Sequence, residues 1–445
     1  MKISFCLAVI LCLSFSSVFG EMDTLRVSGT AYSPDITVKA RFGGRLYMSK
    51  VVDSIYDMSL SGKKGLGYIR YRNTYKVYLS EKKVNRFCFQ DIDGREELVV
   101  NDEINQYLRD KNKRLKKNSL EIKYFNLPVY KKDYEEFVNF IDSVFSVQKN
   151  ILNEAKFEDK YFNYIENIEL LSLRANFVLK YLLINKINSI PDLSFMQGIK
   201  LNDTLAYTAS DEYKKFINLY LDKIAQDSIK KNGLSLNDYL FVKYEKINEV
   251  IGCPEIKYNL LTILIEKAVS QFGVTEEVTR LYRGYVAKTP DKYRSEKVQI
   301  LYRKMDALSK GEVPPIVAYD QEKNEVFLEN LLGQKIYLML YSFHCKECLD
   351  ELQFIKAHEE LFERNNIAIV TIAMDGGDDE WRSFIKTQNI QGSINLHAFN
   401  NRREIMGKLM VRKLPTVIIV DSNHMITNLR APKLTEDNFN ALFKL

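Results

Sequence analysis

Two cysteines, Cys345 and Cys348, stand where the residue pattern changes from strand-like to helix-like. The apolar run 336–341 predicts a strand before them, and the spaced apolar residues of 349–355 predict an amphipathic helix after them. Two intervening residues in a first helical turn bring both sulfurs close enough to form and break a disulfide. The helix N-terminus stabilises a thiolate, which lowers the pKa of the first cysteine. The spacing therefore predicts a redox-active pair, with Cys345 as the nucleophile and Cys348 as the resolving thiol.

A proline before a later strand-like run is the second informative feature. Leu414 and Pro415 precede the apolar run 416–420. A cis bond between them would expose the backbone of Leu414 opposite the cysteines, where an extended substrate segment can pair with it. We therefore expect Leu414 and Pro415 to bind substrate; the alternative is an ordinary proline at a strand start.

Other uses of a cysteine pair need residues that do not stand near this one. A zinc site needs about four ligands, and of the histidines only His344 is close, because His358, His397 and His424 are scattered. Covalent haem attachment needs a histidine directly after the second cysteine, where Leu349 stands. A peroxidatic cysteine would need an upstream proline that is missing here. We expect no metal and no cofactor.

Charged neighbours of the pair act in opposite directions. A protonated His344 and Lys346 favour the thiolate of the first cysteine, whereas Glu347 opposes it. A solvated turn residue is the alternative for His344. Asp375 and Asp378 follow the next apolar run, where we expect a loop or N-cap role, with assistance to proton transfer as the alternative.

The N-terminus has the parts of a secretory signal. Lys2 supplies the positive charge, 5–15 an apolar stretch too short to span a bilayer, and 18–20 a small-residue cleavage site. We therefore expect residues 1–20 to be removed and the mature chain to be exported to the periplasm or cell envelope.

Cysteine usage agrees with this reading. Of the 6 cysteines, Cys6 and Cys12 fall in the signal, and those that remain are too few for a disulfide framework. Cys88 and Cys253 stand among apolar neighbours and are expected to be buried. A disulfide between them in an oxidising compartment is the alternative.

The net charge is small beside the number of charged residues. It is +6, from 64 basic and 58 acidic side chains, and the only dense basic run is 109–117. We expect this run to be a solvated helix end or an interdomain segment, with contact to anionic envelope components as the alternative. Export makes nucleic acid an unsuitable partner.

Residue patterning divides the mature chain into three parts. Residues 21–105 alternate apolar and polar residues between turns, which predicts a small antiparallel β domain. Residues 106–310 carry apolar stripes at helical spacing, one of them after Ser210 as N-cap, which predicts an α-helical region. After a proline-containing linker, residues 311–445 alternate strands and helices, with one helix expected over 348–364, which predicts an α/β domain. The expected helices of the middle part include 134–155, 161–187, 237–250, 258–272 and 292–308.

Several segments of the last part match one known family. They are 341–348 with both cysteines, 413–416, Asp421 before a predicted hairpin, and 430–432 before the last helix. With them, residues 315–445 resemble the TlpA/ResA-like branch of the thioredoxin superfamily, and the whole chain resembles multidomain envelope thioredoxins of Gram-negative bacteria. The resemblance implies a thioredoxin-like fold and periplasmic thiol-disulfide exchange, usually reductive. His344 stands where the family commonly has tryptophan, and no proline separates the cysteines.

Two functional hypotheses follow from these features. The first is an exported enzyme that reduces protein disulfides through Cys345 and Cys348, with a membrane-embedded thiol reductase as its electron donor. The second is an envelope binding or assembly protein in which the thioredoxin-like domain is a docking module. The large remainder of the chain motivates the second hypothesis, and the presence of both cysteines favours the first.

Overall fold

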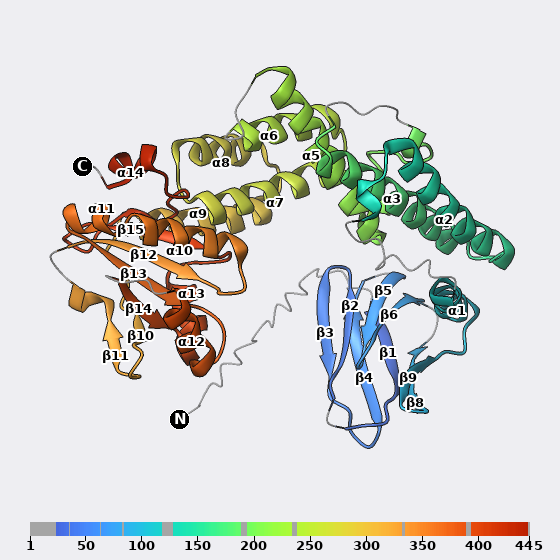
Figure 1. Cartoon of the computed structure of the whole chain (residues 1–445). Helices are drawn as coiled ribbons and strands as arrows, with labels where there is room; N and C mark the ends of the chain where they lie inside the picture. The colour runs from blue at the N-terminus through green and yellow to red at the C-terminus, as the bar shows by residue number, and fades with distance from the viewer. Residues whose placement is uncertain are drawn as a thin grey trace, which may run out of the picture. The chain divides into compact units, whose positions relative to one another are not determined.

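The structure is a computed structural model that describes residues 24–34, 36–62, 64–81, 84–117, 128–187, 194–233, 238–331, 334–388 and 393–443. The predicted signal peptide, residues 1–20, lies outside the described residues. The chain divides into two compact units, Met1–Asp227 and Ser228–Leu445, whose helices and strands are labelled in Figure 1. The domain boundaries expected after residues 105 and 310 stay predictions.

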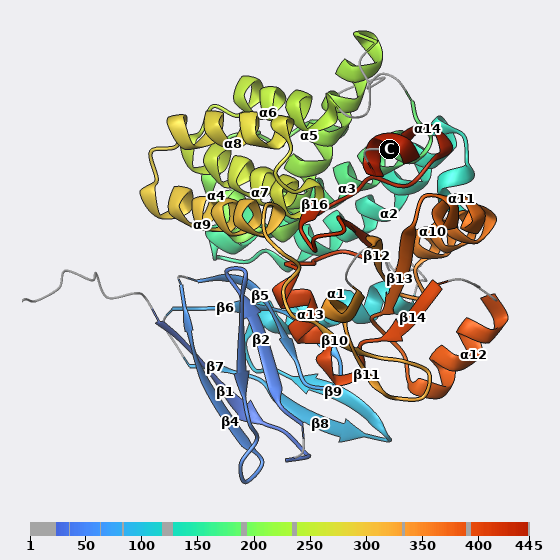
Figure 2. The ribbon, with the colours of Figure 1, turned by 90° about the vertical axis from the view of Figure 1, so that its left-hand side faces the viewer.

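Short sheets open the first unit. Along β4, Tyr56, Met58 and Leu60 are buried while Asp57 and Ser59 between them are exposed, so that one face of the strand packs into a core. The sheets have the strand orders β4-β1-β7, β3-β2-β5-β6 and β8-β9, and β1 pairs with β7 in parallel (Figure 2). The strands are β1 Thr24–Thr30, β2 Val38–Phe42, β3 Arg45–Ser49, β4 Ile55–Ser61, β5 Gly65–Arg70, β6 Thr74–Leu79, β7 Asn85–Arg86, β8 Cys88–Ile92 and β9 Arg95–Val99.

Helices make up the rest of the first unit. Helix α2 has the bounds that the sequence predicts, and Asp133 caps it by accepting a hydrogen bond from the Glu136 N–H at 2.8 Å. Ser210 caps α5 as predicted, because its Oγ accepts from the Tyr213 N–H at 3.0 Å. The helices are α1 Glu103–Lys117, η2 Val129–Lys131, α2 Tyr134–Ala155, α3 Lys160–Ile184, η3 Ser194–Met196, α4 Thr204–Ala209 and α5 Asp211–Lys231.

An aromatic cluster joins the sheet to these helices. Tyr78 of β6 meets the ring of Phe162 in α3 edge-on, with ring centroids 5.2 Å apart. Tyr107 of α1 meets Phe157 edge-on at 5.0 Å. Since large aromatic side chains bury the most apolar area, this cluster fixes α1 and α3 against β6.

The basic run 109–117 lies in α1, and the expectation of a solvated segment is wrong for one of its residues. Lys111 is only 8% exposed, and its ammonium pairs with the carboxylate of Glu166 from α3. A lysine that reaches a buried carboxylate turns inward, which composition alone does not reveal.

The helices that precede the sheet of the second unit, among the described residues after α5, are α6 Tyr239–Val250, α7 Pro254–Phe272, α8 Glu276–Lys288 and α9 Lys292–Ser309. Helix α8, which the sequence analysis left out, begins at the N-cap Thr275. No helix in the described ranges is both long and apolar enough to cross a membrane.

One mixed sheet forms the centre of the second unit, in the strand order β11-β10-β14-β13-β12-β15-β16. Strand β12 pairs in parallel with β13 and antiparallel with β15. The strands are β10 Val317–Tyr319, β11 Glu325–Phe327, β12 Lys335–Tyr341, β13 Ile367–Ala373, β14 Ser393–His397, β15 Thr416–Val420 and β16 Ile426–Asn428. The helices around it are η5 Leu328–Leu331, α10 Lys346–Ala357, α11 Glu359–Arg364, α12 Asp378–Gln388, η6 Phe399–Asn401, α13 Arg402–Lys408 and α14 Glu436–Phe443.

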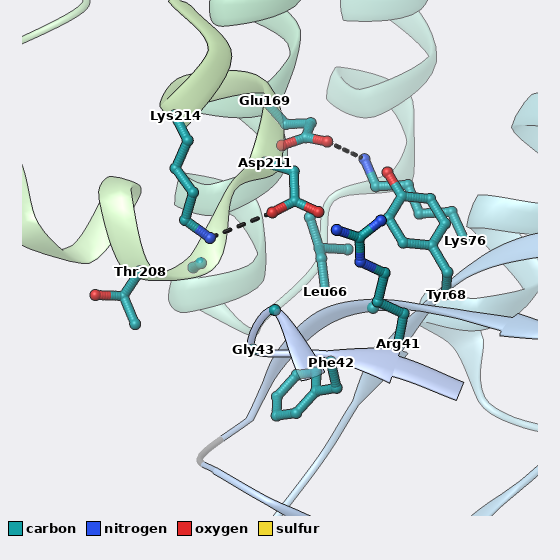
Figure 3. A pocket seen from close by; sticks show the side chains of 13 residues that line it. Arg41, Phe42, Gly43, Leu66, Tyr68, Lys76, Glu169, Thr208, Asp211 and Lys214 are labelled. Carbon is teal, nitrogen blue, oxygen red and sulfur yellow. Dashed lines mark hydrogen bonds and ion pairs between the residues drawn. The ribbon is translucent and has the colours of Figure 1, made fainter. Parts of the chain in front are cut away.

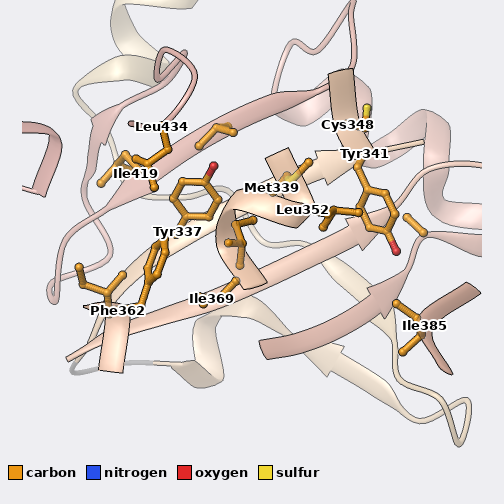
Figure 4. Close-up of a cluster of buried hydrophobic side chains, with 14 of the residues drawn as sticks. Tyr337, Met339, Tyr341, Cys348, Leu352, Phe362, Ile369, Ile385, Ile419 and Leu434 are labelled. Carbon is orange, nitrogen blue, oxygen red and sulfur yellow. The ribbon is translucent and has the colours of Figure 1, made fainter. Parts of the chain in front are cut away.

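The core of this sheet positions the cysteine pair. Tyr337, Met339 and Tyr341 of β12 point into one apolar cluster with Leu352 of α10 (Figure 4). Cys348 belongs to the same cluster, so the helix that carries the cysteines is held on the sheet by its buried face. The helix expected over 348–364 is in fact two helices, α10 and α11, which meet at His358.

A buried arginine ties the sheet to the preceding helices. The Arg430 guanidinium donates to the carbonyl oxygens of Ser270 at the end of α7 (3.1 Å) and of Leu409 and Met410 after α13 (3.1 and 2.8 Å). Burial lowers the pKa of Arg430 to about 10, so it stays charged at neutral pH. Because the last carbonyls of a helix lack partners within that helix, one side chain caps two helix ends.

Candidate functional site

Cys345 occupies the N-cap position of α10, directly beyond the end of β12. Its Sγ accepts a hydrogen bond from the backbone N–H of Cys348 at 3.2 Å. The two cysteines lie at disulfide distance, with Cα atoms 5.2 Å apart. The first sulfur therefore receives a backbone donor and the positive end of the helix dipole, both of which stabilise a thiolate.

The two sulfurs differ in accessibility. Cys345 is partly exposed, whereas Cys348 is fully buried in the core of the sheet. A substrate disulfide can approach only a thiol that solvent reaches. The burial pattern therefore suits the roles predicted from the sequence, attack by Cys345 and resolution by Cys348.

The proline loop lies next to the cysteines, although it is far from them in the chain. The Leu414–Pro415 peptide bond is cis. The Sγ of Cys345 is 3.8 Å from the carbonyl oxygen of Leu414. The structure thus brings together Cys345, Leu414 and Pro415 as the sequence analysis expects, while their contact with a substrate stays a prediction.

The loop between β12 and Cys345 is held by the loop after β13. Ser342 Oγ donates to one carboxylate oxygen of Asp375, and the Phe343 N–H donates to the other at 3.3 Å. At Gly376 the backbone is left-handed, with φ +78°, and a Cβ there would lie 1.9 Å from Cζ of Phe343. Asp375 therefore has the loop role, and Gly376 leaves room for the Phe343 ring.

The three predicted tuning residues are all exposed. His344 Nε2 lies 3.6 Å from Oε1 of Glu380, so its ring lies beside α12. Glu347 is nearer to the chemistry, with Oε2 3.7 Å from the Sγ of Cys345, where its charge opposes a thiolate. Lys346 is the remaining charge beside the pair. The tuning role of these residues stays a prediction.

Glu351 is a buried carboxylate beneath the cysteines that the sequence analysis missed. It lies one turn after Cys348 and is 2% exposed. Its Oε1 accepts from the Tyr337 hydroxyl at 2.5 Å and from the Leu434 N–H at 3.1 Å. Burial, and then the nearby carboxylate, raise the pKa of Tyr337 well above its usual value. The sequence does contain a signal for this residue: Glu351 is acidic but stands on the apolar stripe of 348–355, which indicates a buried carboxylate.

Comparison with known proteins agrees with this geometry. The family model of thioredoxin-like domains matches residues 333–426. The thiol-disulfide oxidoreductase ResA of Bacillus cereus is 24% identical over 143 residues, which span 32% of this chain and 72% of that protein. ResA of Bacillus anthracis is 23% identical over 164 residues, 37% of this chain and 84% of that protein.

Residues 333–426 match a thioredoxin-like domain, and the TlpA/ResA-like family fits this part of the chain. The protein is an oxidoreductase of the thioredoxin-like thiol-disulfide class. The matches to ResA span 32% and 37% of this chain, so most of the chain has no counterpart in these proteins.

Two solved structures are similar to parts of this chain. A putative thiol-disulfide oxidoreductase from Bacteroides vulgatus is 20% identical, with a TM-score of 0.29 over 31% of this chain and 96% of that one. A thioredoxin-like protein from Bacteroides caccae is 13% identical to this chain. The match covers 59% of this chain and 90% of that one, with a TM-score of 0.33.

Proposed function

We propose that this oxidoreductase is an exported enzyme that reduces protein disulfides through the couple of Cys345 and Cys348. The observation that carries the proposal is the asymmetry of the pair. One sulfur is partly exposed at a helix N-terminus and accepts the N–H of Cys348 at 3.2 Å, and the other is buried beneath it.

The reaction has two exchange steps. The Cys345 thiolate attacks one sulfur of a substrate disulfide, so that a mixed disulfide forms and the first substrate thiolate leaves. The Cys348 thiolate then attacks the Cys345 sulfur, and the second substrate thiolate leaves. The substrate gains two electrons and two protons, and the enzyme is left with the Cys345–Cys348 disulfide. A membrane-embedded thiol reductase, the proposed donor, returns the enzyme to its dithiol form.

The backbone beside the cysteines supplies a place for the substrate chain. The carbonyl oxygen of Leu414 lies 3.8 Å from the Cys345 sulfur, at the start of β15. An extended segment that pairs with this backbone would present its own cysteine to Cys345, because strand addition fixes the register of a bound peptide. We propose this role for Leu414 and Pro415.

Trapping of the mixed disulfide tests the couple. In a Cys348→Ala variant the second step is blocked, so substrates should accumulate on Cys345 as adducts that disappear on reduction. A Cys345→Ser, Cys348→Ala variant is the matched control and should trap none. The absence of adducts in the single variant would contradict the proposed mechanism.

Direction and location need separate measurements. A reduction potential near that of thioredoxin, about −270 mV, supports a reductase, whereas one near the oxidant DsbA, about −120 mV, contradicts it. N-terminal sequencing of the protein recovered from its native cells should begin near Glu21. Retention of Met1 would refute export without affecting the redox chemistry.

A further inference from the structure

A cavity of about 300 Å³ lies in the first unit, outside the thioredoxin-like domain. It is bounded by α2 and α3 with residues from β5, β6, α1 and α5. Its volume is at the lower end of the range for small-molecule sites, roughly 300–1,000 Å³. The cavity can therefore hold a small organic molecule.

Three of the residues that line this cavity carry a buried polar atom that lacks a hydrogen-bond partner among the described residues. They are Nε2 of Gln148, Oδ1 of Asn176 and the hydroxyl of Tyr130. These side chains are 1%, 3% and 3% exposed. Buried polar groups are paired in the great majority of cases. The accumulation of one donor, one acceptor and one hydroxyl on the same cavity points to a ligand that offers both acceptors and donors.

Charge in the cavity leaves one cation over. Lys76 lies 3.0 Å from Glu169, Lys111 pairs with Glu166, and Lys215 lies 3.6 Å from Glu212. Burial lowers the pKa of Lys76, but the attraction of the two glutamates outweighs burial and raises it, so this lysine stays charged. Lys180 carries its ammonium 5.2 Å from the centre of the Tyr130 ring, and no carboxylate partner for it is found in the described part of the chain.

The pair of Lys76 and Glu169 closes one side of the cavity. A second cavity of about 20 Å³ shares Tyr68, Lys76 and Glu169 with the first, and Figure 3 shows the ion pair from that side. Its volume suits about one water molecule. The larger cavity is therefore the one with room for a ligand.

Part of the remaining wall is apolar. Leu170, Leu173 and Phe177 of α3 are buried and line the cavity on the helix that also carries Asn176 and Lys180. Apolar walls with a few fixed polar groups are the usual composition of a small-molecule site.

We propose that this cavity binds a small carboxylic acid with hydrogen-bond donors and an apolar side chain, of the size of a free amino acid or a dipeptide. The carboxylate of the ligand lies toward Lys180 and Gln148, where it pairs with the Lys180 ammonium and accepts a hydrogen bond from Nε2 of Gln148. The amino group of the ligand donates to Oδ1 of Asn176. The apolar side chain packs on Leu173 and Phe177.

Calorimetric titration of the full chain with leucine, leucyl-leucine and leucinamide tests this proposal. Leucine or leucyl-leucine should bind and raise the unfolding temperature, since a ligand that binds only the folded state stabilises it. Leucinamide, which lacks the carboxylate, should bind at least about tenfold more weakly.

Two variants locate the site. Gln148→Met should weaken binding about 3- to 10-fold by removing one hydrogen bond, and Lys180→Gln should weaken it by a similar factor. Lys149→Gln is the matched control, because it removes the same charge. Lys149 follows Gln148 in the chain, but it is exposed and does not line this cavity. Its binding should be unchanged.

The free protein gives an independent readout. Gln148→Met removes a buried donor without a partner, so the unfolding temperature of the free variant should be unchanged or higher. A lower unfolding temperature would assign the amide a structural role and overturn the proposal. Failure of both leucine and leucyl-leucine to bind at millimolar concentration would overturn it as well. So would binding of these ligands to the Gln148→Met and Lys180→Gln variants with the same affinity as to the unchanged protein.

Discussion

Replacement of Gly376 by alanine should destabilise the thioredoxin-like domain far more than the same change at Gly377. Gly376 has φ +78°, and a Cβ there would lie 1.9 Å from Cζ of Phe343. A Cβ built at Gly377 would have no neighbouring heavy atom within 4 Å. The adjacent glycine is therefore a matched control for side-chain size and position.

The expected magnitude has two parts. A left-handed backbone costs an L-residue about 1–2 kcal/mol. The ring of Phe343, which stacks on Phe384 with centroids 5.4 Å apart, must also move. Overpacking of this kind costs about 1–3 kcal/mol. Gly376→Ala should therefore lower the free energy of unfolding by about 2–5 kcal/mol, and Gly377→Ala, at the N-cap position of α12, by no more than about 1 kcal/mol.

Urea unfolding followed by tryptophan fluorescence measures both variants. Trp381 is the only tryptophan of the chain and is fully buried in the core of this domain. Its emission therefore reports on the thioredoxin-like domain alone. With a slope of about 2 kcal/mol per molar urea, the midpoint of Gly376→Ala should fall by about 1–2.5 M.

A second substitution separates the two parts. In a Phe343→Ala background the obstructing ring is gone, so Gly376→Ala should cost only the backbone strain, about 1–2 kcal/mol. Equal midpoints for Gly376→Ala and Gly377→Ala would refute the reasoning. The same cost with and without the Phe343 ring would refute the steric part alone.

Two further predictions concern buried and exposed charge. Lys111→Met should destabilise the first unit by about 3 kcal/mol, because it leaves the buried Glu166 carboxylate with only Lys76, 3.6 Å away and shared with Glu169, as a cation. Lys113→Met removes only an exposed pair and should cost less than about 1 kcal/mol, and calorimetric unfolding compares the two variants. Hydrogen bonds that the His358 ring donates to the carbonyl oxygen of Phe354 and to the carboxylate of Glu436 raise the pKa of His358 above 6.5. The stabilisation from His358 should be fully present below pH 6.5 and lost as the pH rises through the raised value, and His358→Gln should abolish this dependence in fluorescence-monitored unfolding.

Local patterns carried most of the prediction for the thioredoxin-like domain. A strand before Cys345 and a helix after it follow from residue periodicity, and the bounds of β12 agree closely with the run 336–341. Outside this domain, α2 has the predicted bounds 134–155. Periodicity succeeds here because it records which residues of one segment share a face. It could not divide the helix at His358, since both halves carry apolar residues at helical spacing.

Only the tertiary structure showed which distant residues contact the buried faces of these helices and strands. Glu351 meets Tyr337 inside the core, and Asp375 holds Ser342 from another loop. A sequence pattern shows that a position is buried but not which distant residue covers it.

The chain by itself thus determined the chemistry of the dithiol, because the spacing of Cys345 and Cys348 and the helix after them are local properties. The tertiary structure decided that Leu414 lies beside the nucleophile, and that Lys111 turns inward to Glu166 near a cavity. These contacts depend on the packing of segments far apart in the chain, and that packing is the sum of many weak interactions that no short motif encodes.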